Sequence, residues 1–326
     1  MGTAKRLTGK QRYIKALRHE KISGHVPTFE LVFFLTMEKF GKVHPTHRYF
    51  GQWNQMSKAE QEAQLADAAS VYIETAKAYG HDAIFVHPPR PEFENVKRLL
   101  ELIREKSGDE YYLTMHGDPT FAMPDGNHMI EFSARLYEDP EGIIAEQQAN
   151  MKSMLDFAEK INKTGKLLDG FTLCADYCFN TNPFFTPEMF GNLIAPTLAQ
   201  VIDGYRKMGY YSVKHTDGNI MPIVGQMLDC KPDGLHSLDP QGGVDLKYMK
   251  KKYGGKVCLI GNVNCGLLQT GTIEEMAADV RRCLRDGMEG PGGFIFSTSN
   301  CVYTGMPLER YELMMDIWRK EGIYKE

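Results

Sequence analysis

The residues that could carry chemistry follow a series of short apolar segments. Asp239, Cys265 and Cys301 follow three consecutive segments in the second half of the chain. If these segments are neighbouring parallel strands, about 4.8 Å apart, the three side chains can converge on one ion. Two thiolates and a carboxylate suit a catalytic zinc site, which keeps one open position, whereas sulfur ligands disfavour Mg or Ca. Alternatively, both cysteines are small residues packed beside tight turns, and Asp239 with Pro240 forms only a turn.

Other titratable residues occupy similar positions. His116, Asp176, His215 and Asp217 also follow apolar segments, and Glu30 lies within the first segment. His215 and Asp217 are a candidate metal-ligand or substrate-binding pair if their strand continues past residue 214. The alternative is a turn in which Asp217 and the following glycine break the chain.

Aromatic residues crowd the same region and could line an apolar pocket for a planar ring. The alternative, which is stronger for Phe190, is a loop packed on its own following helix. His236 is expected to be structural, at the flank of its strand. The aromatic set is Tyr177, Phe179, Phe184, Phe185, Phe190 and Tyr303.

Composition excludes several classes of protein. The 326 residues include 38 Lys and Arg against 42 Asp and Glu, a net charge of −4. This balance offers no basic surface for nucleic acid or an anionic membrane, and no apolar stretch is long enough to span a bilayer. The basic N-terminus lacks the apolar core of a secretion signal. We therefore expect a cytoplasmic protein whose seven cysteines are reduced.

Eight short apolar runs alternate with helical patterns, which predicts one α/β domain over residues 1–326 that forms a (β/α)8 TIM barrel. Active sites of such barrels lie at the carboxyl ends of the strands. A doubly wound sheet is disfavoured because no glycine-rich turn follows the first run. The predicted strands are Val26–Phe33, Ala83–Val86, Tyr111–Met115, Gly170–Ala175, Tyr210–Lys214, Gly234–Leu238, Val257–Gly261 and Gly293–Ser297.

Helices are predicted between these runs. A capping box from Thr272 to Glu275 opens one helix, Thr186 and Pro187 open another, and Gly80 ends a third. Further patterns fit helices at 92–106, 139–161, 220–229, 244–252 and 307–320. Residues 1–25 should form a helical extension covering the bottom of the barrel. The stretch 117–138 is too long for an ordinary loop and suggests a hairpin lid.

Several long blocks of the sequence resemble the uroporphyrinogen decarboxylase superfamily. The opening GKQRYIKALRHEKISGHVP is similar to the family's first helix and strand, and four later blocks are similar to its strand ends: HTDGNIMPIV, LHSLDPQGG, LIGNVNCGLLQTGTIEEM and GGFIFSTSNCVYTGMPLERYELM. The resemblance implies a (β/α)8 barrel. It does not carry over the decarboxylase activity, because the arginine-rich segment that binds the tetrapyrrole carboxylates is replaced here by the apolar residues 29–35, which include a carboxylate.

The superfamily's other large branch consists of zinc-dependent methyltransferases that exchange a methyl group with a corrinoid (cobalamin) protein. Members that methylate a small thiol carry a His-x-Cys pair, where this chain has His215-Thr-Asp217. The sequence is more similar to the O-demethylase methyltransferases (methyltransferase I) of anaerobes. On that resemblance the zinc ligands are Asp239, Cys265 and Cys301, with His215 also catalytic.

The resemblance implies a reaction in which a methyl group leaves a methoxylated, aromatic donor for the Co(I) centre of a partner corrinoid protein. Zinc would stabilise the leaving phenolate, whose conjugate acid has a pKa of about 10. Tyr177, Phe179, Phe185 and Tyr303 would hold the ring, and His116, Asp176, His215, Asp217 and Glu30 complete the predicted substrate site.

Two other functions stay open from sequence. One is a metal-free decarboxylase or lyase of the same superfamily that uses Asp176 and His215 as acid and base. The other is a noncatalytic module that only binds the corrinoid protein. The sequence does not decide between a monomer and a homodimer.

Overall fold

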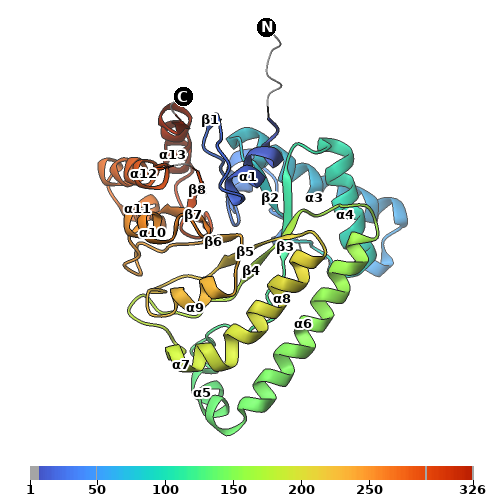
Figure 1. Ribbon diagram of the computed structural model, residues 1–326. Helices are drawn as coiled ribbons and strands as arrows, with labels where there is room; N and C mark the ends of the chain where they lie inside the picture. The colour runs from blue at the N-terminus through green and yellow to red at the C-terminus, as the bar shows by residue number, and fades with distance from the viewer. Residues whose placement is uncertain (1–6, 49, 291, 325–326) are drawn as a thin grey trace.

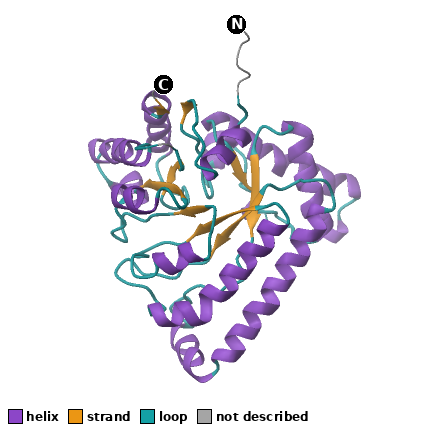
Figure 2. Cartoon of the chain, in the orientation of Figure 1, coloured by secondary structure: helices purple, strands orange, loops and turns teal. Residues whose placement is uncertain are grey.

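A parallel sheet surrounded by helices forms the centre of the protein. In the computed structural model, residues 7–48, 50–290 and 292–324 are described. Seven parallel strands follow one another in chain order, and the sheet curls so that helices cover its outer face (Figures 1 and 2). The strands are β2 Ala83–Phe85, β3 Tyr112–His116, β4 Gly170–Cys174, β5 Tyr211–His215, β6 Gly234–His236, β7 Cys258–Val263 and β8 Phe294–Thr298. This is a TIM-barrel-like α/β architecture.

The helices connect successive strands, as the alternating sequence pattern predicts. They are α1 Gly9–Leu17, α2 Thr36–Phe40, α3 Lys58–Tyr79, α4 Phe93–Ser107, α5 Met129–Glu138, α6 Pro140–Asn162, α7 Pro187–Met189, α8 Ala195–Lys207, α9 Val224–Asp229, α10 Leu246–Tyr253, α11 Cys265–Thr270, α12 Ile273–Gly287 and α13 Leu308–Glu321. Short helical turns lie at η1 Pro45–His47, η2 Trp53–Gln55 and η3 Phe190–Ile194. A two-stranded antiparallel sheet joins β1 Gly24–His25 to β9 Ile323–Tyr324.

The predicted helix ends are confirmed where the sequence carries capping residues. Thr272 and Glu275 form a capping box at the start of α12, and the Thr186 side chain accepts the Met189 N–H at the start of α7. Gly80 ends α3 in the left-handed conformation. The N-terminal helix α1 packs beside β2, β3 and β8, with Lys10 donating its N–H to the carbonyl just before β3. It therefore covers the amino-terminal end of the sheet. Of the helical extension predicted over residues 1–25, the helix itself spans Gly9–Leu17, and residues 1–6 lie outside the described residues.

The segment 26–33, predicted as the first barrel strand, does not form a regular strand. It makes isolated parallel bridges, Thr28 to Phe296 and Phe33 to Val302. Pro27 has no N–H to donate, and the Thr28 N–H donates to the Asp82 carboxylate at 2.8 Å instead of to a backbone carbonyl. The described residues thus contain a seven-stranded parallel sheet in place of the predicted eight strands.

The stretch 117–138 also differs from the prediction of a hairpin. Its first part is irregular and its last ten residues form helix α5, which packs on α6. The Met123 N–H donates to the Asp176 carbonyl at 2.7 Å, so the irregular part lies beside the end of β4. None of the helices in the described part of the chain has both the length and the apolar character that a membrane crossing requires.

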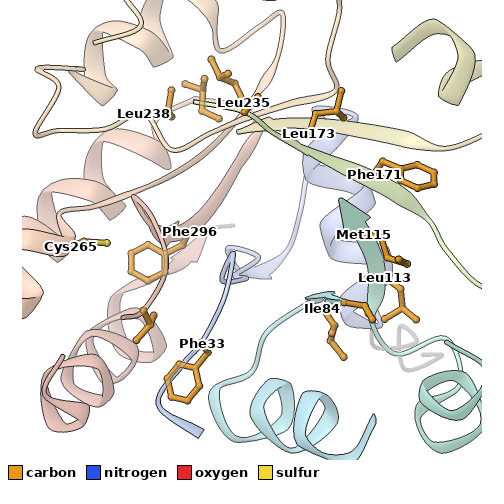
Figure 3. Packing of buried hydrophobic residues seen from close by; sticks show 14 of the residues in the cluster. Phe33, Ile84, Leu113, Met115, Phe171, Leu173, Leu235, Leu238, Cys265 and Phe296 are labelled. Carbon is orange, nitrogen blue, oxygen red and sulfur yellow. The ribbon is translucent and has the colours of Figure 1, made fainter. Parts of the chain in front are cut away.

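Apolar side chains from successive strands fill the space between the sheet and the helices that surround it. Figure 3 shows part of this core, where Leu113 and Met115 of β3, Phe171 and Leu173 of β4 and Phe296 of β8 are all buried. The apolar core holds the strands in register, so that their carboxyl ends meet at one rim.

One ion pair is buried between the sheet and the segments that pack on its outer face. Lys214 of β5 is fully buried, and its ammonium lies 2.7 Å from an Asp118 carboxylate oxygen and 4.1 Å from the centre of the Tyr177 ring. Its remaining donors meet the carbonyls of Leu173 and Ala175. Although burial alone would raise it, the Lys214 ammonium holds the pKa of Asp118 below its usual range. The pair ties the loop after β3 to β5, directly before His215.

Glu30 fastens the segment 26–33 to β8. Its carboxyl group accepts hydrogen bonds from Ser297 and from the backbone and side chain of Thr298, and a 3.2 Å bond from the Tyr311 hydroxyl. Burial raises the pKa of Glu30 to about 7, even though these donors favour its charged form. The Glu30 carboxyl group thus obtains its hydrogen bonds from within the protein.

We predict that Lys214→Met lowers the free energy of unfolding by about 3–5 kcal/mol, because it leaves the buried Asp118 carboxylate without a cation. Urea unfolding measures this change. The double variant Lys214→Met/Asp118→Asn should be more stable than Lys214→Met alone, since it removes the unpaired charge. If the free energy of unfolding of Lys214→Met stays within about 1 kcal/mol of the wild-type value, the assigned role is contradicted.

We predict that Glu30 makes stability fall as pH rises from about 4.5 to about 7. Its folded pKa of about 7 lies above the ordinary value of 4.5, so its stabilising contribution is complete below 4.5 and is lost as the buried group ionises. The full change is on the order of 3 kcal/mol. Urea unfolding at pH 5 and pH 8 should show a larger loss for the wild type than for Glu30→Gln. Equal losses would mean that Glu30 is already ionised at pH 5.

Candidate functional site

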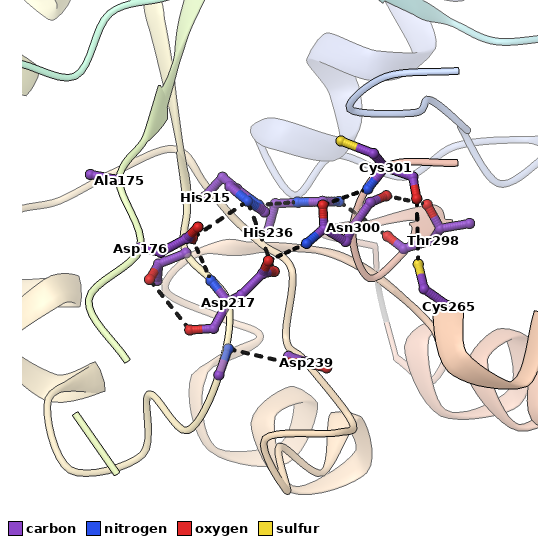
Figure 4. A network of polar contacts seen from close by, with 12 residues as sticks. Ala175, Asp176, His215, Asp217, His236, Asp239, Cys265, Thr298, Asn300 and Cys301 are labelled. Carbon is purple, nitrogen blue, oxygen red and sulfur yellow. Dashed lines mark hydrogen bonds and ion pairs between the residues drawn. The ribbon is translucent and has the colours of Figure 1, made fainter. Parts of the chain in front are cut away.

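The carboxyl ends of the strands bring several of the predicted site residues to one rim of the sheet. Asp176 follows β4, His215 is the last residue of β5, and Asp217 lies two positions further along. Asp239 follows β6, Cys265 begins the helix after β7, and Cys301 follows β8. Figure 4 shows these six side chains around the rim.

Three of these residues form a cluster able to hold a metal ion. Ligand atoms of Asp176, His215 and Asp217 all lie within 4.8 Å of one another. The His215 Nε2 atom lies 3.8 Å from an Asp176 oxygen and 3.9 Å from Asp217 Oδ1. His215 is buried, while the two carboxylates are partly open to solvent. One imidazole and two carboxylates thus face a common point at the rim.

A tight turn after β5 brings Asp217 back to the cluster. Its N–H donates to Asp176 Oδ1 at 2.9 Å, and the next residue, Gly218, has a φ of +79°. A Cβ atom at Gly218 would lie 2.5–2.6 Å from the carbonyl oxygens of Phe179 and Cys178, so only glycine fits this backbone. The strand therefore ends at His215, and the turn, which was the alternative interpretation of this pair, is itself what directs Asp217 to the site.

The electrostatics of the cluster fit a cation. Asp217 Oδ1 is buried and makes no hydrogen bond of ordinary geometry among the described residues, while the Asn300 side chain donates to Oδ2. The Ser237 hydroxyl, which is also buried and unpaired among these residues, lies near this carboxyl group and favours its charged form. Burial, and then the neighbouring Asp176 carboxylate, raise the pKa of Asp217 to about 7. An orphaned carboxylate oxygen beside a second carboxylate and an imidazole is a donor set that a divalent cation would satisfy.

His236 of β6 also belongs to the site, although the sequence had suggested only a structural role for it. It is paired with His215 in the sheet register and is fully buried. The two imidazoles meet through their Nδ1 atoms at 2.7 Å. The signal in the sequence was a histidine inside an otherwise apolar buried run, where a polar side chain needs a partner. Asn300, which contacts Asp217, was likewise missed.

The predicted zinc ligands Asp239, Cys265 and Cys301 are not brought together in this structure. Asp239 accepts the N–H groups of Gly218 and Gln241 at 3.2 and 2.9 Å. The Cys265 thiol donates to the Cys301 carbonyl at 3.7 Å, and Figure 4 shows the Cys301 sulfur on the other side of its backbone. Among the residues described, the group that meets the geometric requirement for a metal is the Asp176–His215–Asp217 cluster.

The cysteines are free, as predicted. Burial raises the pKa of both the Cys265 and Cys301 thiols to about 12. In the absence of a cation both are therefore neutral thiols at physiological pH. This protonated state is the one expected of cysteines packed in the core.

The predicted substrate-binding aromatics divide into two groups. Tyr177 and Phe185 are fully buried, and Tyr177 is covered by Lys214. Phe179 is 39% exposed beside the Gly218 turn, and Tyr303 is partly buried close to Asp217 and Cys265. Of these four aromatic side chains, Phe179 and Tyr303 are therefore the two that are not fully buried.

The two other residues predicted to contact the substrate, His116 and Glu30, differ in their exposure to solvent. His116, the last residue of β3, is exposed at the rim. Glu30 is 5% exposed and its carboxyl group is taken up by β8 and Tyr311. Glu30 thus belongs to the interior of the sheet rather than to its open end.

Comparisons with known proteins agree with this architecture. The structure is similar to a methyltransferase from Methanosarcina mazei, with a TM-score of 0.72 and 16% identity over 97% of this chain and 99% of the other. It is also similar to the putative vitamin-B12-independent methionine synthase from Listeria monocytogenes, with a TM-score of 0.51 and 12% identity over 93% and 97% of the two chains. At these identities the likeness shows the fold. No curated protein matched the sequence.

A family model gives the relationship directly. The model described as uroporphyrinogen decarboxylase (URO-D) matches residues 127–321, more than half of the chain. This region contains β4 to β8 and every residue of the metal-ligand cluster. The family predicted from the strand-end blocks is thus confirmed, and the chain belongs to the uroporphyrinogen decarboxylase family.

Proposed function

We propose that this protein is a zinc-dependent methyltransferase. It moves a methyl group from a methoxylated aromatic compound to the Co(I) centre of a partner corrinoid protein. The observation that carries the proposal is the cluster of Asp176, His215 and Asp217 at the open end of a TIM-barrel-like sheet. The similarity in fold to a methyltransferase along nearly the full length of both chains supports this branch of the family.

The three residues supply the ligands that a catalytic zinc site needs. His215 offers an imidazole nitrogen, and Asp176 and Asp217 each offer a carboxylate oxygen, which leaves a fourth position open for substrate. When bound, the ion would act as a Lewis acid toward the oxygen of the leaving phenolate. The orphaned Asp217 Oδ1 atom supports the fit, because a cation would satisfy a buried acceptor that the protein leaves unpaired.

The chain's own contribution is to position the donor molecule. Tyr303 lies close to Asp217, and Phe179 is exposed on the segment whose backbone packs against the Gly218 turn. These two rings would contact a planar aromatic donor. His116 is exposed at the same rim and could donate to a polar substituent of that ring. The methyl group would then point away from the sheet, where a partner protein can approach.

The metal-free lyase is less well supported. That reaction would use His215 as an acid–base group with Asp176. Burial, with the neighbouring Lys214 ammonium, lowers the pKa of His215 to about 3, so the ring carries no proton to give as an acid near neutral pH. The same neutral ring is the form that binds a metal ion.

We predict that the protein binds about one zinc ion per chain and that Asp217→Asn weakens zinc binding at least tenfold. Competition with a chromogenic chelator measures the affinity. Cys265→Ser is the matched control and should bind zinc as the wild type does. The reverse pattern, in which Cys265→Ser loses the ion and Asp217→Asn keeps it, would instead favour the ligand set Asp239, Cys265 and Cys301.

We also predict methyl transfer from at least one aryl methyl ether. The zinc-loaded protein is mixed with a reduced corrinoid protein and a panel of methoxylated aromatics, methylamines, thiols and methanol, and methyl-Co(III) formation is followed spectroscopically. Asp217→Asn should slow the reaction at least tenfold. Transfer that proceeds equally well after zinc removal would contradict the proposed role of the metal.

A further inference from the structure

A line of buried polar side chains runs from the metal-ligand cluster into the interior of the sheet. His215 Nδ1 meets His236 Nδ1 at 2.7 Å. His236 Nε2 lies 3.1 Å from the Thr298 carbonyl oxygen and 3.3 Å from Ser297 Oγ. Ser297 Oγ in turn donates to the Glu30 carboxyl at 3.3 Å. The line therefore joins β5, β6, β8 and the segment 26–33, and it ends at the cluster. Figure 4 shows its outer part, with His215, His236 and Thr298.

The Thr298 carbonyl fixes the proton of His236. A carbonyl oxygen only accepts hydrogen bonds, so His236 Nε2 must carry the hydrogen that points to it. His236 is fully buried, and among the described residues its ring nitrogens contact only His215, Ser297 and the Thr298 carbonyl, none of which is a carboxylate. An uncompensated charge is costly in such a place, so the ring is neutral and holds a single N–H. Its Nδ1 atom is consequently a bare acceptor.

The proton of His215 follows from that of His236. Two bare nitrogens 2.7 Å apart would repel each other, so His215 Nδ1 must donate the hydrogen that His236 Nδ1 accepts. His215 is also buried, and no described residue offers its Nε2 atom an acceptor within hydrogen-bond distance. With its hydrogen on Nδ1, the ring therefore has none on Nε2. This free lone pair belongs to the atom that lies 3.8 Å from Asp176 and 3.9 Å from Asp217.

Glu30 and Ser297 reinforce this arrangement. The Ser297 hydroxyl has one hydrogen, and the Glu30 carboxyl takes it. Ser297 Oγ can therefore only accept from His236 Nε2, as the Thr298 carbonyl does. The carboxyl group is held in turn by Thr298 and Tyr311. Two acceptors thus face the same nitrogen, and both require its hydrogen.

We propose that His236, held by the Thr298 carbonyl and Ser297, is a positioning residue that keeps His215 in the Nδ1–H tautomer and so aims the Nε2 lone pair at the cation between Asp176 and Asp217. This inference rests on the proposed metal site and adds how its imidazole ligand is prepared. The ligand needs neither a change of tautomer nor a ring flip when the ion arrives. Groups that orient a ligating imidazole in this way commonly contribute 10- to 100-fold in metal affinity.

The tautomer is measured on the metal-free wild-type protein. Nitrogen-15 NMR of the histidine side chains should show a protonated Nδ1 and an unprotonated Nε2 for His215, and the reverse for His236. Assignment uses His215→Gln and His236→Asn as reference samples. A His215 ring protonated at Nε2 would overturn the inference, whatever the protein does with zinc.

Variants of His236 test the consequence for metal binding. His236→Leu removes the acceptor and should weaken zinc binding 10- to 100-fold. In His236→Asn the side-chain oxygen replaces Nδ1 as an acceptor for His215, so affinity should recover to within a few-fold of the wild type. A purely structural role for His236 would give no such recovery, and thermal unfolding of both variants shows whether each is folded.

The outcomes separate the two proposals. If Asp217→Asn and His215→Gln leave zinc binding unchanged, the metal site itself is misplaced. If those two variants lose zinc while His236→Leu binds as tightly as the wild type, the metal site stands and the positioning role of His236 is overturned. Because Ser297→Ala removes only the weaker acceptor, it should cost less affinity than His236→Leu.

Discussion

The contact between the imidazoles of His215 and His236 joins the interior of the sheet to its open end. It exists because β5 and β6 are neighbouring parallel strands in a register that sets these two residues side by side. A buried imidazole must satisfy both of its nitrogens, and here one nitrogen of each ring satisfies the other. The second nitrogen of His236 then turns inward to β8, and that of His215 turns outward to Asp176 and Asp217. The geometry of the candidate site follows from this pairing.

The rest of the structure keeps that pairing in place. The buried Lys214 is tied to Asp118 and lies over Tyr177, which anchors β5 one residue before His215. Glu30 binds Ser297 and Thr298 and so holds the end of β8 against His236. The backbone of Gly218 turns the chain so that Asp217 reaches the cluster. Buried polar groups of this kind are costly unless fully paired, which leaves the orphaned Asp217 oxygen as the place where a cation would complete the network.

Much of the fold could be predicted from the sequence because local signals agree with the final structure. Capping at Thr272, the helix stop at Gly80 and the apolar runs of β2 to β8 each depend on nearby residues. The segment 26–33 departs from its prediction because Pro27 and the Asp82 carboxylate remove the hydrogen bonds of a regular strand. The stretch 117–138 ends in a helix, and its length alone gave no sign of which structure it would take.

The sequence identified the residues of the candidate site, but not which of them come together. Asp176, His215 and Asp217 were all selected at strand ends, but their convergence depends on the turn at Gly218, whose direction no strand pattern specifies. Cys265 and Cys301 were grouped because their strands are neighbours. The direction of each side chain depends on the turn that follows its strand, and here the Cys265 thiol faces the carbonyl of Cys301 rather than its sulfur. His236 was overlooked because a histidine within a strand looks structural until its partner across the sheet is known.

Crystals of the protein grown with zinc would test the central claim most directly, through the anomalous scattering of the metal at its absorption edge. The account predicts one strong peak within bonding distance of His215 Nε2 and an Asp217 oxygen, with His215 Nδ1 still facing His236. A peak held by Asp239 and Cys265, with the His215 ring outside its coordination shell, would contradict it.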